Sequence, residues 1–304
     1  MTWFLAAIIG HTANGAAFII DKILLQKAFK RSATYAGLVG ILSFLSVVVL
    51  PWVDSWPHGI MLYVAMASGA TFIFALRSFF ASLSRAEASR VVPIVGSLIP
   101  IFTLLGTATF LGERLNVQQW IGFALLILAT VILAGGGKSS KAKHKAVVFA
   151  VIAAILFAIS FVTGKAVYDS SGFLGGFLVT RLAAAGTAIL MVTLLDPFAG
   201  REILSIFRPK SGHLGKKANQ AAGLAIVGQS LGAGGFILVQ FAISEGSAAI
   251  VNALQAVQYA FIVIIALLFR SHAKDLLGER LHMSTMVPKL IAILITAIGM
   301  ALVV

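Results

Sequence analysis

Cysteine is absent from this chain of 304 residues, and charged residues make up only 11% of it. Without a thiol the protein can form no disulfide bond and can carry out no cysteine chemistry. The small share of charged residues, 60% hydrophobic residues and a mean hydropathy of +1.02 together exclude a soluble globular domain. The chain is therefore predicted to lie in a lipid bilayer.

Motifs that indicate an enzyme are also missing. The sequence has no Gly-x-Ser-x-Gly nucleophile elbow, no His-Glu-x-x-His metal site, no P-loop and no acidic pair within one apolar run. It therefore predicts no catalytic residue, no metal site and no cofactor. Because an ATP-binding motif is absent, any uphill transport has to draw on an ion gradient. Coupling to protons, coupling to another ion and passive exchange all stay open.

What the sequence does contain is ten long apolar runs. A bilayer core about 30 Å thick needs roughly 20 helical residues, and the alternation expected of barrel strands is absent. The runs are therefore predicted to be transmembrane helices. They lie at residues 3–20, 35–51, 59–80, 91–110, 117–135, 146–163, 173–195, 218–240, 247–269 and 285–304.

The net charge of +13 predicts an orientation rather than a nucleic-acid partner. The loops after the odd-numbered runs hold 18 of the 23 lysines and arginines, whereas the opposite loops and the termini hold only Arg114 and Lys165. By the positive-inside rule the basic loops face the cytoplasm. We expect a multi-pass protein of the bacterial inner membrane with both termini outside the cytoplasm.

One pattern occurs twice in the chain. Leu-Gly-Glu-Arg-Leu stands at residues 111–115 and again at 277–281, each time between a long apolar run and a final one. Upstream of these pentapeptides the two halves pair at an offset of 160 residues, as Val91 does with Val251. Since each copy holds five runs, an odd number, the second copy enters the membrane upside down. The predicted fold is an all-α integral membrane protein of ten transmembrane helices in two inverted-topology five-helix repeats.

The repeats also define the domain boundaries. The first repeat is predicted over residues 1–137 and the second over residues 146–304, joined by a flexible basic linker at 138–145. A longer polar stretch, from Asp196 to Lys217, contains two prolines and several Gly and Ser residues. This composition predicts a surface loop.

Motifs in both halves carry a family resemblance. The segment 88–93 with the first pentapeptide, and the segment 247–249 with the second pentapeptide and Gly299, resemble the drug/metabolite transporter superfamily, EamA type. The resemblance implies repeats that end in a leucine-glycine-glutamate turn, and a central cavity lined by spans 1, 3, 4, 6, 8 and 9. Family members commonly keep both termini in the cytoplasm, whereas the loop charges here predict the reverse.

Polar side chains within the apolar runs are the candidate substrate-binding residues, because burying such groups in lipid is costly. Three of them, in the ninth run, share one helical face. For each residue the alternative role is an interhelical hydrogen bond that holds the bundle together. The candidates are His11, Asn14, Ser160, Gln229, Asn252, Gln255 and Tyr259.

These features together predict a carrier or exchanger of a small metabolite, such as an amino acid, a nucleoside or an amphipathic drug. Its expected partners are the substrate, the lipid bilayer and protons or another coupling ion, with no nucleic acid. The alternative is a membrane-embedded enzyme or lipid-handling protein. That class is expected to cluster acid–base or nucleophilic residues at one membrane interface.

The loop charges generate a prediction about orientation. Single cysteines introduced at Ser140 and Ser211 are expected to resist an impermeant thiol reagent in intact cells, and one added after Val304 to react. Because the chain has no cysteine of its own, the unmodified protein is a blank control. Reaction at the two loop positions together with protection of the C-terminus would show that the protein has the opposite orientation.

Overall fold

The structure of the protein is a computed structural model, and it describes residues 1–28, 32–86, 88–134, 144–206, 213–269 and 283–304. Over these ranges the chain forms helices and no β-strand. Most of the predicted linker, residues 138–143, and the second pentapeptide lie outside the described residues.

The helices follow the ten predicted runs closely. The first half contains α1 (Thr2–Ala28), α2 (Ser32–Leu42) with its 3₁₀ continuation η1 (Ser43–Trp52), α3 (Ile60–Leu83), α4 (Ala88–Phe110) and α5 (Val117–Ala134). The second half contains α6 (His144–Ser171), α7 (Phe173–Leu190) with its π-helical continuation η2 (Met191–Leu195), α8 (Pro197–Ile206), α9 (His213–Glu245), α10 (Ala248–Ala253), α11 (Gln255–Leu268) and α13 (Met283–Val303).

The length and surface of these helices suit a bilayer. Eight helical segments are long and apolar enough to cross it, and Ile94–Phe110 and Val117–Leu133 are shorter apolar helices. Large apolar side chains such as Phe110, Leu194 and Leu268 are exposed on the outside of the bundle. Lipid tails can cover such a surface at no cost, whereas water cannot. The predicted all-α membrane architecture is confirmed at this level.

The predicted surface loop from Asp196 onward is wrong in its first half, because α8 occupies residues 197–206. Asp196 Oδ1 accepts a hydrogen bond from Ala199 N at 3.2 Å, and Pro197 follows as the first helical residue. An aspartate cap before a proline is a helix start signal, since proline has no N–H to leave unsatisfied. Ala199 and Ile203 are buried, and α8 packs against α2.

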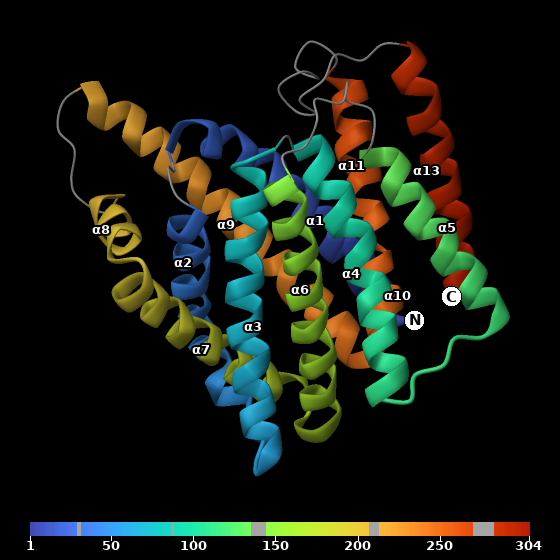
Figure 1. The fold of residues 1–304 in the computed structure, drawn as a ribbon, viewed down its shortest axis with the longest axis horizontal. Helices are drawn as coiled ribbons and strands as arrows, with labels where there is room; N and C mark the ends of the chain where they lie inside the picture. Colours follow the sequence, from blue (N-terminus) through green and yellow to red (C-terminus); the bar gives the residue numbers. More distant parts are fainter. Residues whose placement is uncertain (29–31, 87, 135–143, 207–212, 270–282) are drawn as a thin grey trace.

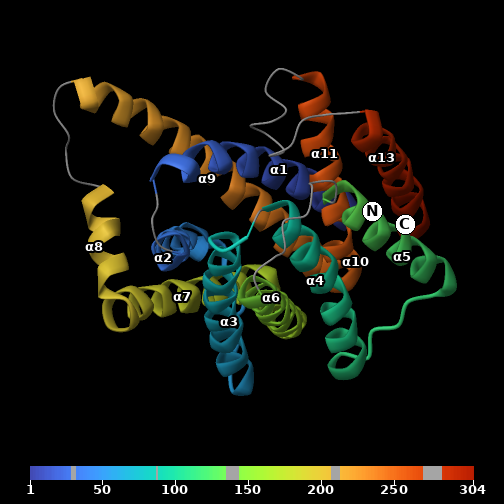
Figure 2. The ribbon, with the colours of Figure 1, turned by 45° about the horizontal axis from the view of Figure 1, so that its top comes forward.

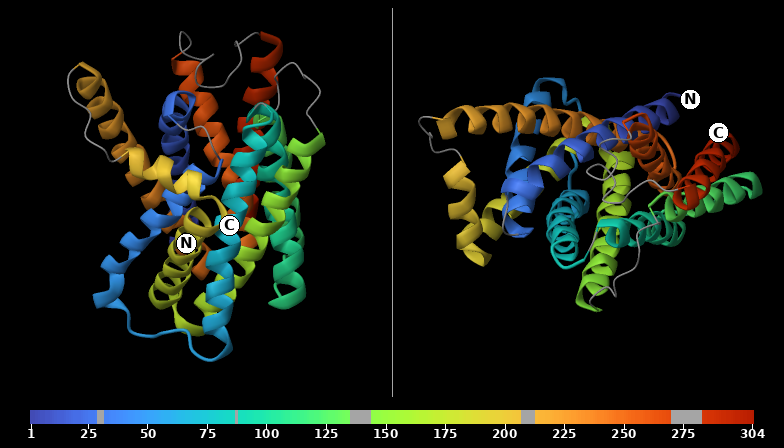
Figure 3. Two further views of the ribbon diagram at one scale, coloured as in Figure 1. Left: turned by 60° about the vertical axis from the view of Figure 1, so that its left-hand side comes forward. Right: turned by 90° about the horizontal axis from the view of Figure 1, so that it is seen from above.

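Three helix pairs make the most extensive contacts in the bundle. They are α3 with α6, α1 with α9, and α5 with α13. Figure 2 shows α1 and α9 side by side, and Figure 3, seen from above, places α5 and α13 at one edge of the molecule and α8 at the other.

Successive spans alternate in direction. In Figure 1, α4, α6, α9 and α13 run from the top of the molecule downward, whereas α3 and α11 run upward. The ends that lie at the top of this view therefore adjoin the loops that are rich in lysine and arginine.

The first pentapeptide forms the turn that ends α4. Leu111 N and Glu113 N both donate to Thr107 O, at 2.9 and 3.2 Å, and Gly112 has a φ of +68°. This is a helix C-cap with its glycine in the left-handed conformation. A Cβ at Gly112 would meet no atom within 4 Å, so backbone conformation rather than space requires glycine here.

We expect Gly112→Ala to destabilise the protein by about 1–2 kcal/mol, because an L-residue with a side chain pays that cost in the left-handed region. The measurement is the melting temperature in detergent. Gly186→Ala is the matched control, since Gly186 is exposed within α7 and a Cβ there also meets nothing. That helical alanine is expected to leave the melting temperature unchanged or to raise it.

Candidate substrate site

The ninth span is interrupted at Leu254, nearer to its first end than to its last. It was expected to run as one helix over 247–269, but α10 ends at Ala253 and α11 begins at Gln255, with Leu254 between them. At this break Val257 N donates to Leu254 O over 2.9 Å, an i to i+3 bond in place of the usual i to i+4 bond. The described part of this span contains no proline, and side chains around the break form hydrogen bonds with it.

His11 of α1 supplies one of those side chains. Its Nε2 lies 2.8 Å from Val251 O, and because a carbonyl only accepts, Nε2 carries the hydrogen. The imidazole is 4% exposed. Gln258 lies beside the ring, yet His11 Nδ1 is buried and makes no hydrogen bond with the described residues. The ring therefore anchors the break with one nitrogen and keeps an acceptor on the other.

Two further hydrogen bonds join the break to its surroundings. Asn252 Nδ2 donates to Thr103 Oγ1 of α4 at 3.4 Å, and Gln255 Nε2 donates to Tyr259 Oη at 3.1 Å. Tyr259 lies over Gly96 of α4, where a Cβ would come within 2.7 Å of the tyrosine hydroxyl.

Four of the seven sequence-predicted residues are thus brought together where α1, α4, α10 and α11 meet. We call this group, with Thr103, the span-9 cluster. It comprises His11, Thr103, Asn252, Gln255 and Tyr259.

The other three predicted residues lie elsewhere. Asn14 packs over Gly235 of α9, where a Cβ would fall 2.5 Å from Asn14 Oδ1. Gln229 Nε2 donates to Tyr35 Oη of α2 at 3.1 Å. Ser160 faces Ser68 of α3 in a reciprocal pair, in which each hydroxyl donates to the other residue's carbonyl at 2.9 and 2.8 Å. This pairing favours the alternative role of Ser160, a bond between helices.

Arg181 is a residue whose importance the sequence did not reveal. It lies about eight residues into the apolar run 173–195, and in the structure it is only 3% exposed. Its guanidinium carbon lies 4.4 Å from the ring centroid of Phe72, 4.6 Å from that of Phe236 and 6.0 Å from that of Phe177. The signal available in the sequence was the arginine itself, since a charge within an apolar run is costly unless it has a function.

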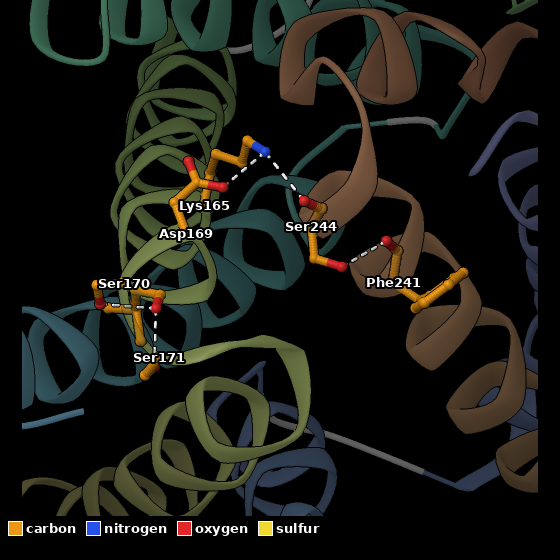
Figure 4. Close-up of polar contacts among 7 residues, drawn as sticks. Lys165, Asp169, Ser170, Ser171, Phe241 and Ser244 are labelled. Atoms are coloured by element: carbon orange, nitrogen blue, oxygen red, sulfur yellow. Dashed lines mark hydrogen bonds and ion pairs between the residues drawn. The ribbon is translucent and has the colours of Figure 1, made fainter. Parts of the chain in front are cut away.

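A cavity of about 480 Å³ lies beside the turn that joins α6 to α7. It is lined by Trp52, Asp54, Ser55, Ser171, Gly172, Phe173, Leu174, Gly175 and Phe241. Beside it, Lys165 of α6 forms an ion pair with Asp169 at 2.9 Å and donates to Ser244 O of α9 at 3.0 Å (Figure 4). Lys165 thus fastens the end of α6 to the end of α9.

Polar groups at a helix break inside an apolar bundle are also found in carriers, and comparison with known proteins points to a transporter family. The model of the EamA-like transporter family matches residues 1–135. This match covers the first of the two predicted repeats and shows similarity to the EamA-like transporter family there. The resemblance predicted from the sequence is confirmed, and the match supports a membrane transporter of the drug/metabolite type.

Two further similarities concern a relative and a fold. A protein from Sinorhizobium sp, described as "Uncharacterized transporter in cobO 3'region", is 25% identical over 142 residues, which are 44% of this chain and 96% of that protein. This relative is thus about as long as one predicted repeat. A solved crystal structure, described only as a protein, shares the fold over 98% of this chain and 95% of its own, with a TM-score of 0.64 and 16% identity.

The Ser68–Ser160 pair generates a stability prediction. We expect the double variant Ser68→Ala, Ser160→Ala to lower the melting temperature, because each hydrogen bond between membrane helices contributes about 0.6 kcal/mol. Thr163→Val is the control, since Thr163 bonds only carbonyls of its own helix among the described residues. Substrate affinity is expected to stay unchanged in both variants. A loss of affinity without a loss of stability in the double variant would return Ser160 to the binding site.

Proposed function

We propose that the protein is a secondary carrier or exchanger of a small metabolite that works by alternating access. In this proposal residues 1–137 and 146–304 are two five-helix repeats of opposite orientation, joined by the basic linker 138–145. The protein lies in the bacterial cell membrane with both termini outside the cytoplasm. The substrate binds between the repeats, at the level of the span-9 cluster.

The helix directions support the inverted repeats. Under the proposed correspondence α3 pairs with α9, α4 with α10 and α11, and α5 with α13. In Figure 1, α3 runs upward and α9 downward, and α4 runs downward while α11 runs upward. Opposite directions in corresponding helices are what an inverted repeat requires.

The packing pattern gives independent support. Exchanging the repeats converts the contact between α3 and α6 into a contact between α9 and α1, and these two pairs make the most extensive contacts in the molecule. The same exchange maps the α5–α13 and α4–α10 contacts onto themselves, and both are present. A two-fold relation of this kind creates two equivalent closures, one toward each side of the membrane.

The span-9 cluster is the observation that carries the choice of site. Carriers of this architecture bind substrate where a helix is broken at mid-membrane, because the break exposes backbone and side-chain hydrogen-bonding groups that lipid cannot satisfy. Here His11 Nδ1 and the amides of Asn252 and Gln255 offer acceptors and donors. His11 and Asn252 are each 4% exposed, so the substrate reaches them only when the repeats rock apart.

The test of transport is a substrate-library screen in proteoliposomes. Purified protein is reconstituted, and uptake and efflux of amino acids, nucleosides and amphipathic drugs are measured with and without a pH gradient. We expect saturable movement of at least one class. A gradient that drives accumulation identifies proton coupling, and equal exchange without a gradient identifies passive exchange. Protein-free liposomes are the control, and equal rates in both preparations would contradict the proposal.

Variants of the cluster test the site. We expect Asn252→Ala and Gln255→Leu to weaken binding of the identified substrate by roughly 5- to 150-fold, because removing one partner of a buried hydrogen bond costs about 1–3 kcal/mol. The bundle is expected to fold, and Ser160→Ala, which belongs to a helix contact, is the control. Unchanged affinity in both well-folded variants would make the cluster a packing feature and place the site elsewhere.

A further inference from the structure

The surroundings of Arg181 leave its positive charge without a compensating carboxylate. Among the described residues no acidic side chain pairs with Arg181, and the guanidinium packs against Phe72, Phe177 and Phe236, which we call the aromatic cage. Cation–π contacts at these distances contribute about 0.5–2 kcal/mol. A buried ion pays several kcal/mol of desolvation, which the rings offset only in part.

Two neighbouring side chains here are buried with hydrogens that form no hydrogen bond with the described residues. Arg181 Nε and Nη2 are buried without a hydrogen-bond partner among the described residues, and so is Tyr168 Oη of α6. Arg181 and Tyr168 are close enough to interact electrostatically. Thr180 lies beside the phenol, and its hydroxyl donates to Phe177 O at 2.9 Å while its oxygen can still accept a hydrogen. Buried donors of this kind are rare in folded proteins and mark places where an acceptor is missing.

A ligand with a single negative charge would supply the missing acceptor. A carboxylate accepts from the guanidinium through two oxygens and can also accept from a phenol. The other buried basic side chain among the described residues, Lys289, belongs to α13, which packs against α5 and α11. One cation surrounded by apolar rings suits a monoanion attached to an apolar body better than a phosphate, which carries more charge.

A row of aromatic side chains connects this place with the cavity at the α6–α7 turn. Phe173, Phe177 and Arg181 follow one another at intervals of four residues, so they share one face of α7. Phe173 lines the cavity, and its ring centroid lies 5.4 Å from that of Phe177 and 5.5 Å from that of Phe241. Helical rise puts Arg181 about 12 Å from Phe173.

We propose that Arg181 and Tyr168 bind the carboxylate of the substrate and that the aromatic cage holds its apolar body. The substrate class is thus an organic monoanion with an aromatic or aliphatic group. This inference rests on the proposed transport function and adds a second contact region to it, formed by α3, α6, α7 and α9. The substrate enters from the cavity when Phe173 and Phe177 move apart.

The first test compares two ligands on the unmodified protein. N-acetylphenylalanine and N-acetylphenylalanine amide have the same ring and differ at the carboxylate, so calorimetric titration of purified protein at pH 7 isolates the contribution of the charge. We expect the acid to bind at least about 10-fold more tightly than the amide. Equal affinity, or no saturable binding of the acid, overturns the proposal without any variant.

The second test uses three variants with the same two ligands. We expect Arg181→Gln to weaken acid binding by about 10- to 150-fold and Tyr168→Phe to weaken it by about 2- to 12-fold, both with amide binding unchanged. Arg77→Gln is the matched control, since Arg77 is also an arginine within an apolar run but is only half-buried. An equal loss in the control, or no loss in Tyr168→Phe, overturns the proposal even if Arg181→Gln fails to fold.

The outcomes separate this inference from the proposed function. If proteoliposomes exchange neutral or cationic compounds while acid and amide bind equally, transport stands and the anion site is refuted. If the acid binds in an Arg181-dependent manner but no compound is exchanged, the anion site stands and the carrier function is refuted.

Discussion

Lipid offers no hydrogen bonds, and this constraint shapes every level of the protein. Backbone groups in the bilayer core must find partners inside the protein, which is why helices form every described span. Where the backbone hydrogen bonds of a helix are interrupted, a side chain has to supply a hydrogen-bond partner. Near Leu254 this partner comes from α1, where His11 donates a hydrogen bond to Val251 O, a residue 240 positions away in the sequence. The break and its partner are thus a single feature built from both halves of the chain.

The same constraint distinguishes polar groups whose hydrogen bonds are made within the bundle from polar groups that lack a partner there. Ser68 and Ser160 satisfy each other fully, and Lys165 is engaged by Asp169 and Ser244. By contrast His11 Nδ1, Arg181 Nε and Nη2, and Tyr168 Oη stay without partners among the described residues. In a medium that cannot supply water, unsatisfied groups are costly, so their persistence points to a function. Whether a buried polar atom has a hydrogen-bond partner is therefore a better guide to the site than its polarity alone.

Glycine and the helix caps decide where the spans end. Gly112 takes a left-handed conformation at the turn after α4, which gives the first leucine-glycine-glutamate motif a structural role. Asp196 and Pro197 start α8 in a stretch whose composition had indicated a loop. Both are local effects that the sequence contains. The second differs from the predicted loop because proline, which breaks a helix in its interior, is also common at the first helical position.

The sequence alone determined the membrane class, the positions of the apolar helices and the shared face of Asn252, Gln255 and Tyr259, because hydropathy and helical periodicity are local properties. Its motifs also carried the resemblance to EamA-like transporters. It also pointed to His11 without showing its partner. Only the tertiary structure decided that Ser160 pairs with Ser68, that Asn14 packs on α9, that the ninth span breaks at Leu254 and that Arg181 is enclosed by rings from α3, α7 and α9. These facts depend on which helices become neighbours, and a pattern within one span carries no information about the face that another span presents to it.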